Sequence, residues 1–305
     1  MSELQEKERK AIERLKAFEP PEGYYLAFSG GKDSVVCKAL LDAAGVKYDA
    51  TYRVTSVDPP ELVRFIKEKH ADVKREVPRD KYGKAITMWN LIPRKLMPPT
   101  RTMRYCCEHL KESGGDGRMT VTGVRWAESA NRKANQGIVT IPDRNAYKNA
   151  IFSQNSDFTQ TNSGGVVLTN DNTESRRVVE QCYKRHKTNV NPIIDWTDAE
   201  VWEFIKANEI PYCGLYNEGF HRLGCIGCPL ARQKGREIEL NRWPKYKNAY
   251  LLAFAAMLAR RKEIGRPFKI AGAEIKDATP EDVFNWWMGY DVLPGQLTFD
   301  DLEED

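Results

Sequence analysis

The feature that most constrains this chain is a short polar loop between an apolar segment and a helical segment. The apolar run Tyr24–Phe28 has the length of a buried strand, and it leads directly into SGGKDS at Ser29–Ser34. The next residues, Val35–Gly45, are predicted to form a helix that ends at the glycine. A strand that turns through glycines into a helix leaves the first N–H groups of that helix free to bind an anion.

The residue types in this loop suit a phosphate site. Its two glycines permit tight turns and close approach of a ligand, its lysine adds positive charge, and its two serines add hydroxyl donors. The aspartate stands where a helix N-cap or a partner for Mg²⁺ would stand. The spacing differs from the Walker motif G-x-x-x-x-G-K-[ST], and the alternative to a phosphate loop is an ordinary glycine turn. The predicted phosphate-binding residues are Ser29, Gly30, Gly31, Lys32, Asp33 and Ser34.

Apolar periodicity along the chain predicts an α/β fold with a parallel sheet that helices cover on both faces. Strands are expected at residues 24–28, 48–54, 72–77 and 118–124. Helices are expected at residues 3–18, 35–45, 60–70, 198–208, 236–264 and 280–289, so that the C-terminal third is mainly helical. Trp196 and Trp202 are predicted to pack in the core.

The sequence divides into three consecutive regions. Residues 1–22 are predicted to be an N-terminal helix, residues 23–210 a nucleotide-binding α/β domain, and residues 211–305 a region with a cysteine motif and helices. Within the second region, residues 145–191 are dense in Asn, Ser, Thr and Gly. This composition predicts a long loop, either a plain surface loop or a lid.

Charge and hydropathy narrow the class of protein. Forty-seven Lys and Arg against 43 Asp and Glu give a net charge of +4, which permits nucleic acid as a partner without requiring it. The longest apolar run, Ala249–Ala259, is much shorter than the roughly 20 residues of a membrane span, and the sequence begins without a secretory signal. We therefore expect a soluble, cytoplasmic protein that does not associate with membranes.

One local cluster of basic residues falls inside the predicted loop. It would either contact phosphates or remain a solvated part of the loop. Its members are Arg176, Arg177, Lys184, Arg185 and Lys187.

Four of the seven cysteines form two short motifs. Cys106 and Cys107 are adjacent, and Cys225 and Cys228 form a C-x-x-C motif. In a chain without a secretory signal, such motifs favour metal binding or catalysis over a disulfide framework. Adjacent cysteines do not match a standard zinc knuckle, although four thiolates suit either zinc or an iron–sulfur cluster.

The remaining three cysteines stand alone. Cys37 follows the phosphate loop on an apolar helix and is predicted to lie in the core. Cys182 and Cys213 belong to no motif, so each is either a sulfur-carrying thiol or an inert side chain.

Taken together, the motifs resemble those of the adenine-nucleotide α-hydrolase superfamily, the PP-loop ATP pyrophosphatases, and in particular its PAPS reductase family. The SGGKDS loop is similar to the pyrophosphate loop of that superfamily. Three later segments match in the same order. Residues 123–129, followed by Arg132, resemble G-x-R-x-x-E-S; residues 191–202 resemble N-P-[IL]-x-x-W-[ST]-x-x-[DE]-V-W; and residues 216–229 resemble Y-x-x-G-[YF]-x-R-x-G-C-x-x-C-P.

This resemblance implies a fold, a set of cofactors and a set of site residues. The fold would be a Rossmann-like (HUP) α/β sandwich that binds ATP with Mg²⁺. Gly123, Arg125 and Arg132 would join the loop residues in nucleotide binding, and Lys32, Asp33 and Arg125 would be catalytic. The four motif cysteines are similar to the [4Fe–4S] ligands of assimilatory APS reductases, with zinc as the alternative. These implied metal ligands are Cys106, Cys107, Cys225 and Cys228.

Two departures from the sulfonucleotide reductases bear on the reaction. Those enzymes have an altered S-G-G-x-D-S loop and a C-terminal cysteine in an E-C-G-[LI]-H motif, whereas this sequence keeps the loop and has no cysteine after Cys228. The resemblance is therefore closest to the Dnd- and Ssp-type phosphorothioation pyrophosphatases. It implies that the protein splits ATP into AMP and pyrophosphate and thereby adenylates an acceptor for sulfur transfer.

The same resemblance implies partners and leaves two other functions open. A cysteine desulfurase would donate the sulfur, the acceptor would be DNA, tRNA or a small molecule, and the protein could form an oligomer. The first alternative is an APS or PAPS reductase that releases sulfite. The second is a non-catalytic nucleotide-binding subunit of a nucleic-acid modification or defence complex.

Overall fold

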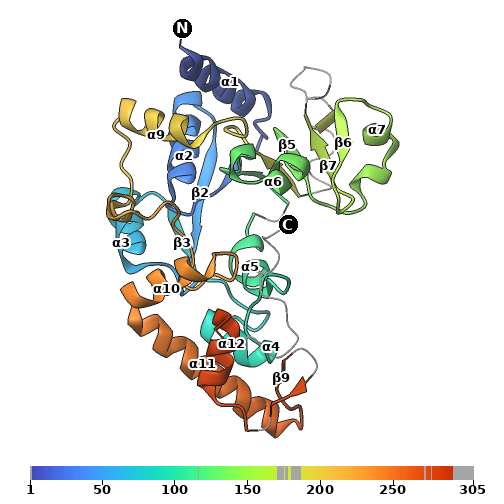
Figure 1. Ribbon diagram of the computed structural model, residues 1–305. Helices are drawn as coiled ribbons and strands as arrows, with labels where there is room; N and C mark the ends of the chain where they lie inside the picture. Colours follow the sequence, from blue (N-terminus) through green and yellow to red (C-terminus); the bar gives the residue numbers. More distant parts are fainter. Residues whose placement is uncertain are drawn as a thin grey trace, which may run out of the picture. The chain divides into compact units, whose positions relative to one another are not determined.

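Figure 1 shows the computed structural model of the protein. It describes residues 2–290, except for residues 116, 170–174, 176, 177, 180–186, 271, 272 and 276. Cys182 and most of the basic cluster (Arg176, Arg177, Lys184 and Arg185) therefore lie outside the described residues. The described member of that cluster, Lys187, donates from Nζ to the carbonyl oxygen of Gly114 at 3.4 Å.

Contacts between residues divide the chain into two compact units, and each unit is built from separate stretches of sequence. The sheet unit comprises the residues up to Arg53 together with Pro60–Glu76 and Ser113–Leu223. The helical unit comprises Val54–Pro59, Val77–Glu112 and the described residues from Gly224 onward. These two units alternate along the chain, so they do not correspond one to one with the three consecutive regions expected from the sequence. That division into three regions stays a prediction.

The sheet unit contains one eight-stranded sheet of order β3-β2-β1-β4-β8-β5-β7-β6. The first five strands in this order are parallel, and the remaining pairs are antiparallel. The parallel strands are β1 (Tyr24–Ala27), β2 (Tyr48–Arg53), β3 (Lys74–Glu76), β4 (Met119–Val121) and β8 (Thr188–Val190). The others are β5 (Val139–Ile141), β6 (Phe158–Gln160) and β7 (Val166–Leu168). The mostly parallel α/β fold is thus confirmed.

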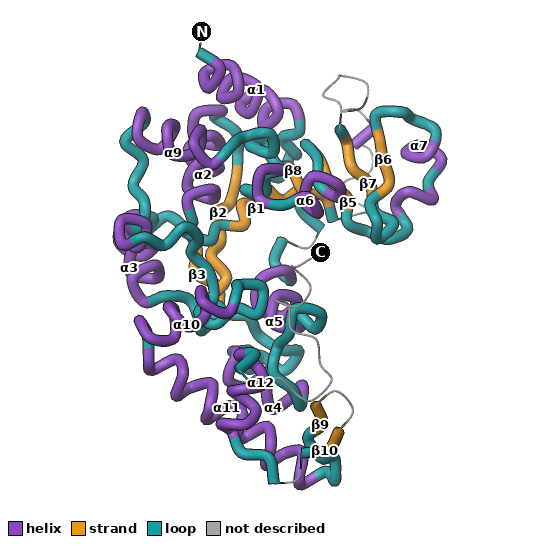
Figure 2. The backbone as a smooth tube through the Cα atoms, viewed as in Figure 1, coloured by secondary structure: helices purple, strands orange, loops and turns teal. Residues whose placement is uncertain are grey.

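Helices flank this sheet (Figure 2). They include α1 (Glu3–Ala17), α2 (Lys32–Ala44), α3 (Pro60–Lys69), α6 (Ala130–Asn135), α7 (Ala150–Ser153) and α9 (Asp198–Ala207), with short 3₁₀ turns η2 (Trp126–Glu128), η3 (Ala146–Lys148) and η4 (Gly214–Glu218). The helix α2 packs against both α1 and α9. Its C-cap, Gly45, adopts a φ of 67°, and Thr197 caps α9 by accepting the Glu200 N–H, so both expected helix boundaries are confirmed.

The segment 145–191, predicted to be a loop, instead contributes three strands to the sheet. It contains β6, β7 and β8, with α7 between β5 and β6. The interpretation as a loop or lid was wrong for these residues because every residue of β7 is buried and pairs with β5 on one side and β6 on the other. Three-residue strands separated by polar turns carry too little apolar periodicity to be read from sequence.

The core of the sheet unit contains most of the residues predicted for it. Trp196 and Cys37 are fully buried. Trp202 is only half-buried, and its ring packs edge-on against Tyr212 and Tyr216 at centroid distances of 5.2 and 5.0 Å. Trp202 therefore lies at the edge of the core, beside the residues that follow α9.

The helical unit is built from α4 (Met88–Lys95), α5 (Tyr105–Cys107), α10 (Gln233–Arg242), α11 (Pro244–Glu263) and α12 (Pro280–Met288). A π-helical turn η1 (Glu108–Glu112) follows α5, and β9 (Lys269–Ile270) pairs with β10 (Ala273–Glu274). The single helix expected at 236–264 is two helices, because Pro244 lacks the N–H that would continue α10 and is instead the first residue of α11.

Aromatic rings fill the centre of the helical unit. The ring of Tyr250 on α11 lies 4.6 Å from Trp287 and 5.2 Å from Trp89, and Phe254 lies 5.6 Å from Trp287. These contacts join α4, α11 and α12 into one core. No helix among the described residues is long and apolar enough to cross a membrane.

Candidate functional site

The SGGKDS loop joins β1 to α2, and its backbone conformation requires glycine at one position. Gly30 has a φ of +73°, and a Cβ atom there would lie 2.8 Å from the side chain of Ile66. Ser34 holds the loop closed, because its hydroxyl donates to the Gly31 carbonyl at 2.9 Å and lies 3.2 Å from the hydroxyl of Ser29. The loop is therefore a preformed turn at the N-terminus of a 13-residue helix.

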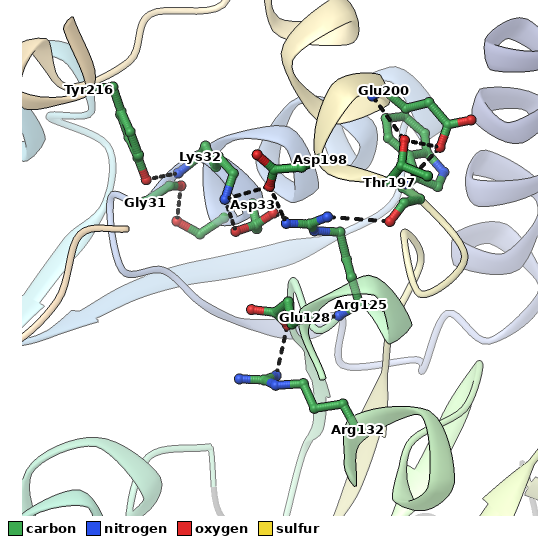
Figure 3. Close-up of polar contacts among 12 residues, drawn as sticks. Gly31, Lys32, Asp33, Arg125, Glu128, Arg132, Thr197, Asp198, Glu200 and Tyr216 are labelled. Atoms are coloured by element: carbon green, nitrogen blue, oxygen red, sulfur yellow. Dashed lines mark hydrogen bonds and ion pairs between the residues drawn. The ribbon is translucent and has the colours of Figure 1, made fainter. Parts of the chain in front are cut away.

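Lys32 is held at the start of α2 by acidic and phenolic partners (Figure 3). It is 6% exposed, and its ammonium lies 3.1 Å from Asp198 Oδ1 and 3.4 Å from Asp33 Oδ2. Its backbone N–H donates to the hydroxyl of Tyr216 at 2.9 Å. The ammonium and the backbone N–H of Lys32 thus both have partners within the protein. Oxygens of a bound phosphate could replace these partners.

Arg125 is nearly fully buried, at 2% exposure. Its guanidinium uses all three nitrogens: Nε donates to Asp33 at 2.7 Å, Nη2 to Asp198 at 2.8 Å, and Nη1 to the Trp196 carbonyl at 3.3 Å. Burial would lower the pKa of Arg125, but the two carboxylates outweigh it and raise the pKa, so the side chain stays charged. Arg125 therefore ties the loop to the beginning of α9.

The carboxylate of Asp198 completes this network. Burial favours its neutral form, but the hydrogen bonds and charges of Lys32 and Arg125 prevail and lower its pKa. Gly123 lets the backbone before Arg125 lie close to Asp33, since a Cβ atom at Gly123 would lie 2.8 Å from the Asp33 side chain. The result is a compact ring of two cations and two carboxylates at the N-terminus of α2.

Arg132 lies outside this ring. Its Nη1 is 3.1 Å from Glu128 Oε2, and the same carboxylate oxygen accepts the backbone N–H of Arg125 at 3.1 Å. In Figure 3 the Arg132 guanidinium lies beside Glu128 and away from the loop. The structure thus brings Arg125 directly to the loop and connects Arg132 to it through Glu128.

Sequence reasoning missed two residues of this site, Asp198 and Tyr216. Tyr216 opens the predicted Y-x-x-G segment, and Asp198 follows the predicted N-cap Thr197, so both stood inside recognised motifs. Acidic residues are common in the first turn of a helix because they interact favourably with the helix dipole. The position of Asp198 in the sequence therefore does not by itself indicate a functional role. The contacts that matter join residues 73 and 184 positions apart, and these pairings depend on the tertiary fold.

Arg125→Lys is expected to lower the free energy of unfolding by about 1–3 kcal/mol, because a lysine cannot satisfy Asp33, Asp198 and the Trp196 carbonyl together. Urea denaturation followed by circular dichroism would measure the loss. Arg132→Lys is the matched control, since it alters a more exposed ion pair and should change stability by less than about 0.5 kcal/mol. Equal stability of the two variants would contradict the bridging role of Arg125.

The four motif cysteines come together in the helical unit. Their side chains line one cavity with about 330 Å³ of empty space, part of it open to solvent. The cavity wall is otherwise mainly apolar and includes Met88, Leu110, Pro229 and Tyr250. Residues 106–107 and 225–228 are thus neighbours in space, as their motifs implied.

Polar contacts hold the two cysteine segments in place. Arg104 Nη2 donates to Cys107 Sγ at 3.3 Å, the Ile226 N–H donates to the Val57 carbonyl at 2.8 Å, and the Gly227 N–H donates to Glu239 at 2.8 Å. A hydrogen bond from Cys106 and the charge of Arg104 lower the pKa of Cys107, while burial raises the pKa of Cys225 to about 12.

The donor set is four cysteine thiols around one cavity. Four thiolates are the ligand set of a structural zinc ion or of an iron–sulfur cluster. No group of three or more His, Cys, Asp or Glu side chains in the described part of the chain is arranged to hold a metal ion.

The two remaining described cysteines lie elsewhere. Cys37 is buried on α2, and Cys213 is 1% exposed at the start of η4. Burial raises the pKa of each thiol, which leaves the described Cys37 and Cys213 in the less reactive protonated form. The thiol of Cys213 therefore has the properties of a core side chain.

Comparison with known proteins places these features in a family. The model of the phosphoadenosine phosphosulfate reductase domain matches residues 23–231. An uncharacterized protein of Methanocaldococcus jannaschii is 25% identical over 240 residues, which are 73% of this chain and 40% of that protein. The adenosine 5'-phosphosulfate reductase of Neisseria meningitidis serogroup A is 43% identical over 53 residues, which are 17% of this chain and 22% of that enzyme.

Among solved structures, the phosphoadenylyl-sulfate reductase of Candida auris aligns with 74% of this chain and 96% of its own, at 13% identity and a TM-score of 0.41. The chain spans less than half the length of these two curated relatives. The family match, by contrast, extends across the SGGKDS loop, the Arg125 segment and all four motif cysteines. On that evidence the chain belongs to the phosphoadenosine phosphosulfate reductase domain family.

Proposed function

We propose that the protein is an ATP pyrophosphatase that adenylates an acceptor and so prepares it for sulfur transfer. The observation that supports this most is the intact SGGKDS loop at the N-terminus of α2, with Lys32 and Arg125 neutralised by Asp33 and Asp198. Two buried cations at the N-terminus of a helix, one of which also offers a backbone N–H now bonded to Tyr216, suit a site for several phosphate charges.

In the proposed reaction, an oxygen of the acceptor attacks the α-phosphorus of ATP. The bond from that phosphorus to the bridging oxygen breaks, pyrophosphate leaves, and the acceptor carries AMP. The N–H groups of α2 and the Lys32 ammonium bind the departing pyrophosphate, whose oxygens replace Asp198 and Tyr216 as partners of Lys32. A sulfur nucleophile then displaces AMP from the acceptor.

Asp33 and Arg125 have different roles in this proposal. Asp33 is partly exposed, so one of its oxygens can face Mg²⁺ bound to the phosphates. Arg125 is expected to act through Asp33 rather than on the α-phosphate directly, because its three nitrogens already have acceptors and it is nearly fully buried. We therefore regard Arg125 as a positioning residue.

We further propose that Cys106, Cys107, Cys225 and Cys228 hold a [4Fe–4S] cluster. With four cysteine ligands every iron has a protein ligand, and the cluster would supply structural support and negative charge. The sulfur would then come from a partner such as a cysteine desulfurase. The acceptor would be a nucleic acid or a small molecule with a nucleophilic oxygen.

Product analysis tests the proposal. Protein purified without oxygen is incubated with Mg²⁺ and ATP labelled at the α-phosphate, with candidate acceptors, and the products are separated. AMP or an adenylated acceptor formed in equal amount to pyrophosphate is the expected result. Formation of ADP and phosphate would contradict the assigned reaction, and tight ATP binding without turnover with any acceptor would favour a nucleotide-binding subunit.

Reduction of a sulfonucleotide is the second candidate. The 43% identity to an adenosine 5'-phosphosulfate reductase over 53 residues favours it. Sulfite release from APS or PAPS in the presence of a thiol reductant would identify this activity. The same preparation assayed with ATP separates the two functions, since only a pyrophosphatase forms pyrophosphate.

A further inference from the structure

Arg236 on α10 is a buried cation that the proposed chemistry does not use. It is 6% exposed, its Nη1 donates to the Trp287 carbonyl at 2.7 Å, and its guanidinium lies 4.1 Å above the Trp287 ring. Its Nε and Nη2 atoms are also buried, and within the described part of the chain they have no hydrogen-bond partner. Burying a charged group with unmet donors is strongly unfavourable unless negative charge lies nearby.

One aromatic residue, Trp287, lies both beside Arg236 and beside the turn that carries Cys225 and Cys228. A Cβ atom at Gly227, in the middle of that turn, would lie 3.0 Å from the Trp287 ring on which Arg236 stacks. Tyr250, which packs on Trp287 at 4.6 Å, lines the cysteine cavity and donates from its hydroxyl to the Ile226 carbonyl at 2.9 Å. Arg236 therefore lies behind the C-x-x-C turn, separated from it by one aromatic ring.

The charges around Arg236 point to the same place. Burial lowers the pKa of Arg236, and neighbouring groups that include Cys228 and Glu239 partly offset this effect. Glu239, one turn further along α10, accepts the Gly227 N–H through Oε2 at 2.8 Å. The helix α10 thus contributes two side chains near the cysteine turn. The Glu239 carboxylate accepts a backbone N–H of the turn, and the Arg236 guanidinium has two N–H donors without an acceptor among the described residues.

We infer that Arg236 is a counter-charge of the anionic centre held by the four cysteines, in addition to Arg104, which donates to Cys107, and Lys111, which lines the cavity. The inference rests on the proposed cluster, and it explains why an arginine occupies a site where a neutral side chain would cost less to bury. Four thiolates around an oxidised [4Fe–4S] core carry a net charge of about −2, and reduction adds one more negative charge. A buried cation nearby stabilises the bound cluster and favours its reduced form.

The test compares Arg236→Met, Arg236→Lys and the control Arg260→Met. Arg260 is exposed on α11 and lies ten residues, or about 15 Å, along the helix from Tyr250. Iron and sulfide content, the rate of iron loss to a chelator and the midpoint potential are measured on each anaerobically loaded protein. Urea unfolding is measured with and without the cluster.

We expect Arg236→Met to lose iron about 10-fold faster than the unaltered protein and to show a more negative potential. Arg236→Lys, which keeps the charge, should show a smaller shift, and Arg260→Met none. The stability that cluster loading adds should shrink for Arg236→Met alone.

A purely structural arginine predicts a different pattern. Arg236→Met would then be destabilised equally with and without the cluster, and its potential and iron loss would match those of the unaltered protein, which would overturn the inference. If Arg236→Met does not fold, Arg236→Gln takes its place: faster iron loss and a more negative potential than in the unaltered protein would support the charge role, and unchanged values of both would overturn it. Absence of iron and sulfide from the unaltered protein would instead contradict the proposed cluster itself.

Discussion

Lys32→Ala is expected to lower the rate of pyrophosphate release from ATP by about 100-fold or more. The ammonium lies at the start of α2, is nearly fully buried and is balanced by Asp33 and Asp198, so it is positioned to receive the charge of the leaving pyrophosphate. Release of pyrophosphate is measured by a coupled assay at saturating ATP.

The matched control for this experiment is Lys38→Ala on the same helix. Lys38 forms ion pairs with Asp42 and Asp72, neither of which belongs to the loop, so its removal should leave the rate within about twofold. Comparable activity in Lys32→Ala and the unaltered protein would show that the SGGKDS loop does not bind the phosphates. A loss in both variants would point to a general defect of α2.

Cys106→Ala is expected to abolish binding of the proposed iron–sulfur cluster. The unaltered protein should contain about four irons and four sulfides per chain and absorb visible light, and the variant should lose both properties because one iron lacks its ligand. Iron, acid-labile sulfide and zinc are measured on protein purified without oxygen.

Cys213→Ala is the control for this second experiment. Cys213 is a buried thiol, whereas Cys106 is partly exposed, and Cys213 does not line the cavity, so its variant should keep the full iron and sulfide content. One zinc per chain without sulfide in the unaltered protein would contradict the cluster and make the cysteines a structural zinc site. Full cluster content in Cys106→Ala would contradict the assigned ligand.

Local signals in the sequence predicted much of the sheet unit. The apolar strand, the glycine-containing loop and the helix that ends at Gly45 are each determined by residues close together in sequence. The sequence therefore predicts β1, the loop and α2 where the structure has them. The same holds for the Thr197 cap of α9. Pro244 is also a local signal for the break between α10 and α11, since a proline favours the first position of a helix over its interior.

Other parts of the fold had no local signal. The strands β6, β7 and β8 are three residues long, and the residues that are buried in them are covered by neighbours from distant parts of the chain. The two units alternate along the chain, so residues 54–59 belong with the cysteine segments although they directly follow β2. Such an arrangement depends on strand order and long-range packing, which residue periodicity does not encode.

The sequence by itself determined three things: the position of the SGGKDS loop, the two cysteine motifs and the membership of the family. Each of them can be recognised from residue types at short spacing. Only the tertiary structure decided the partners: Asp198 and Tyr216 for Lys32, three acceptors for Arg125, and the place of Arg236 behind the C-x-x-C turn. These are contacts between charged or polar groups far apart in sequence. Their strength depends on distance and burial, and both arise only when the sheet and helices have packed.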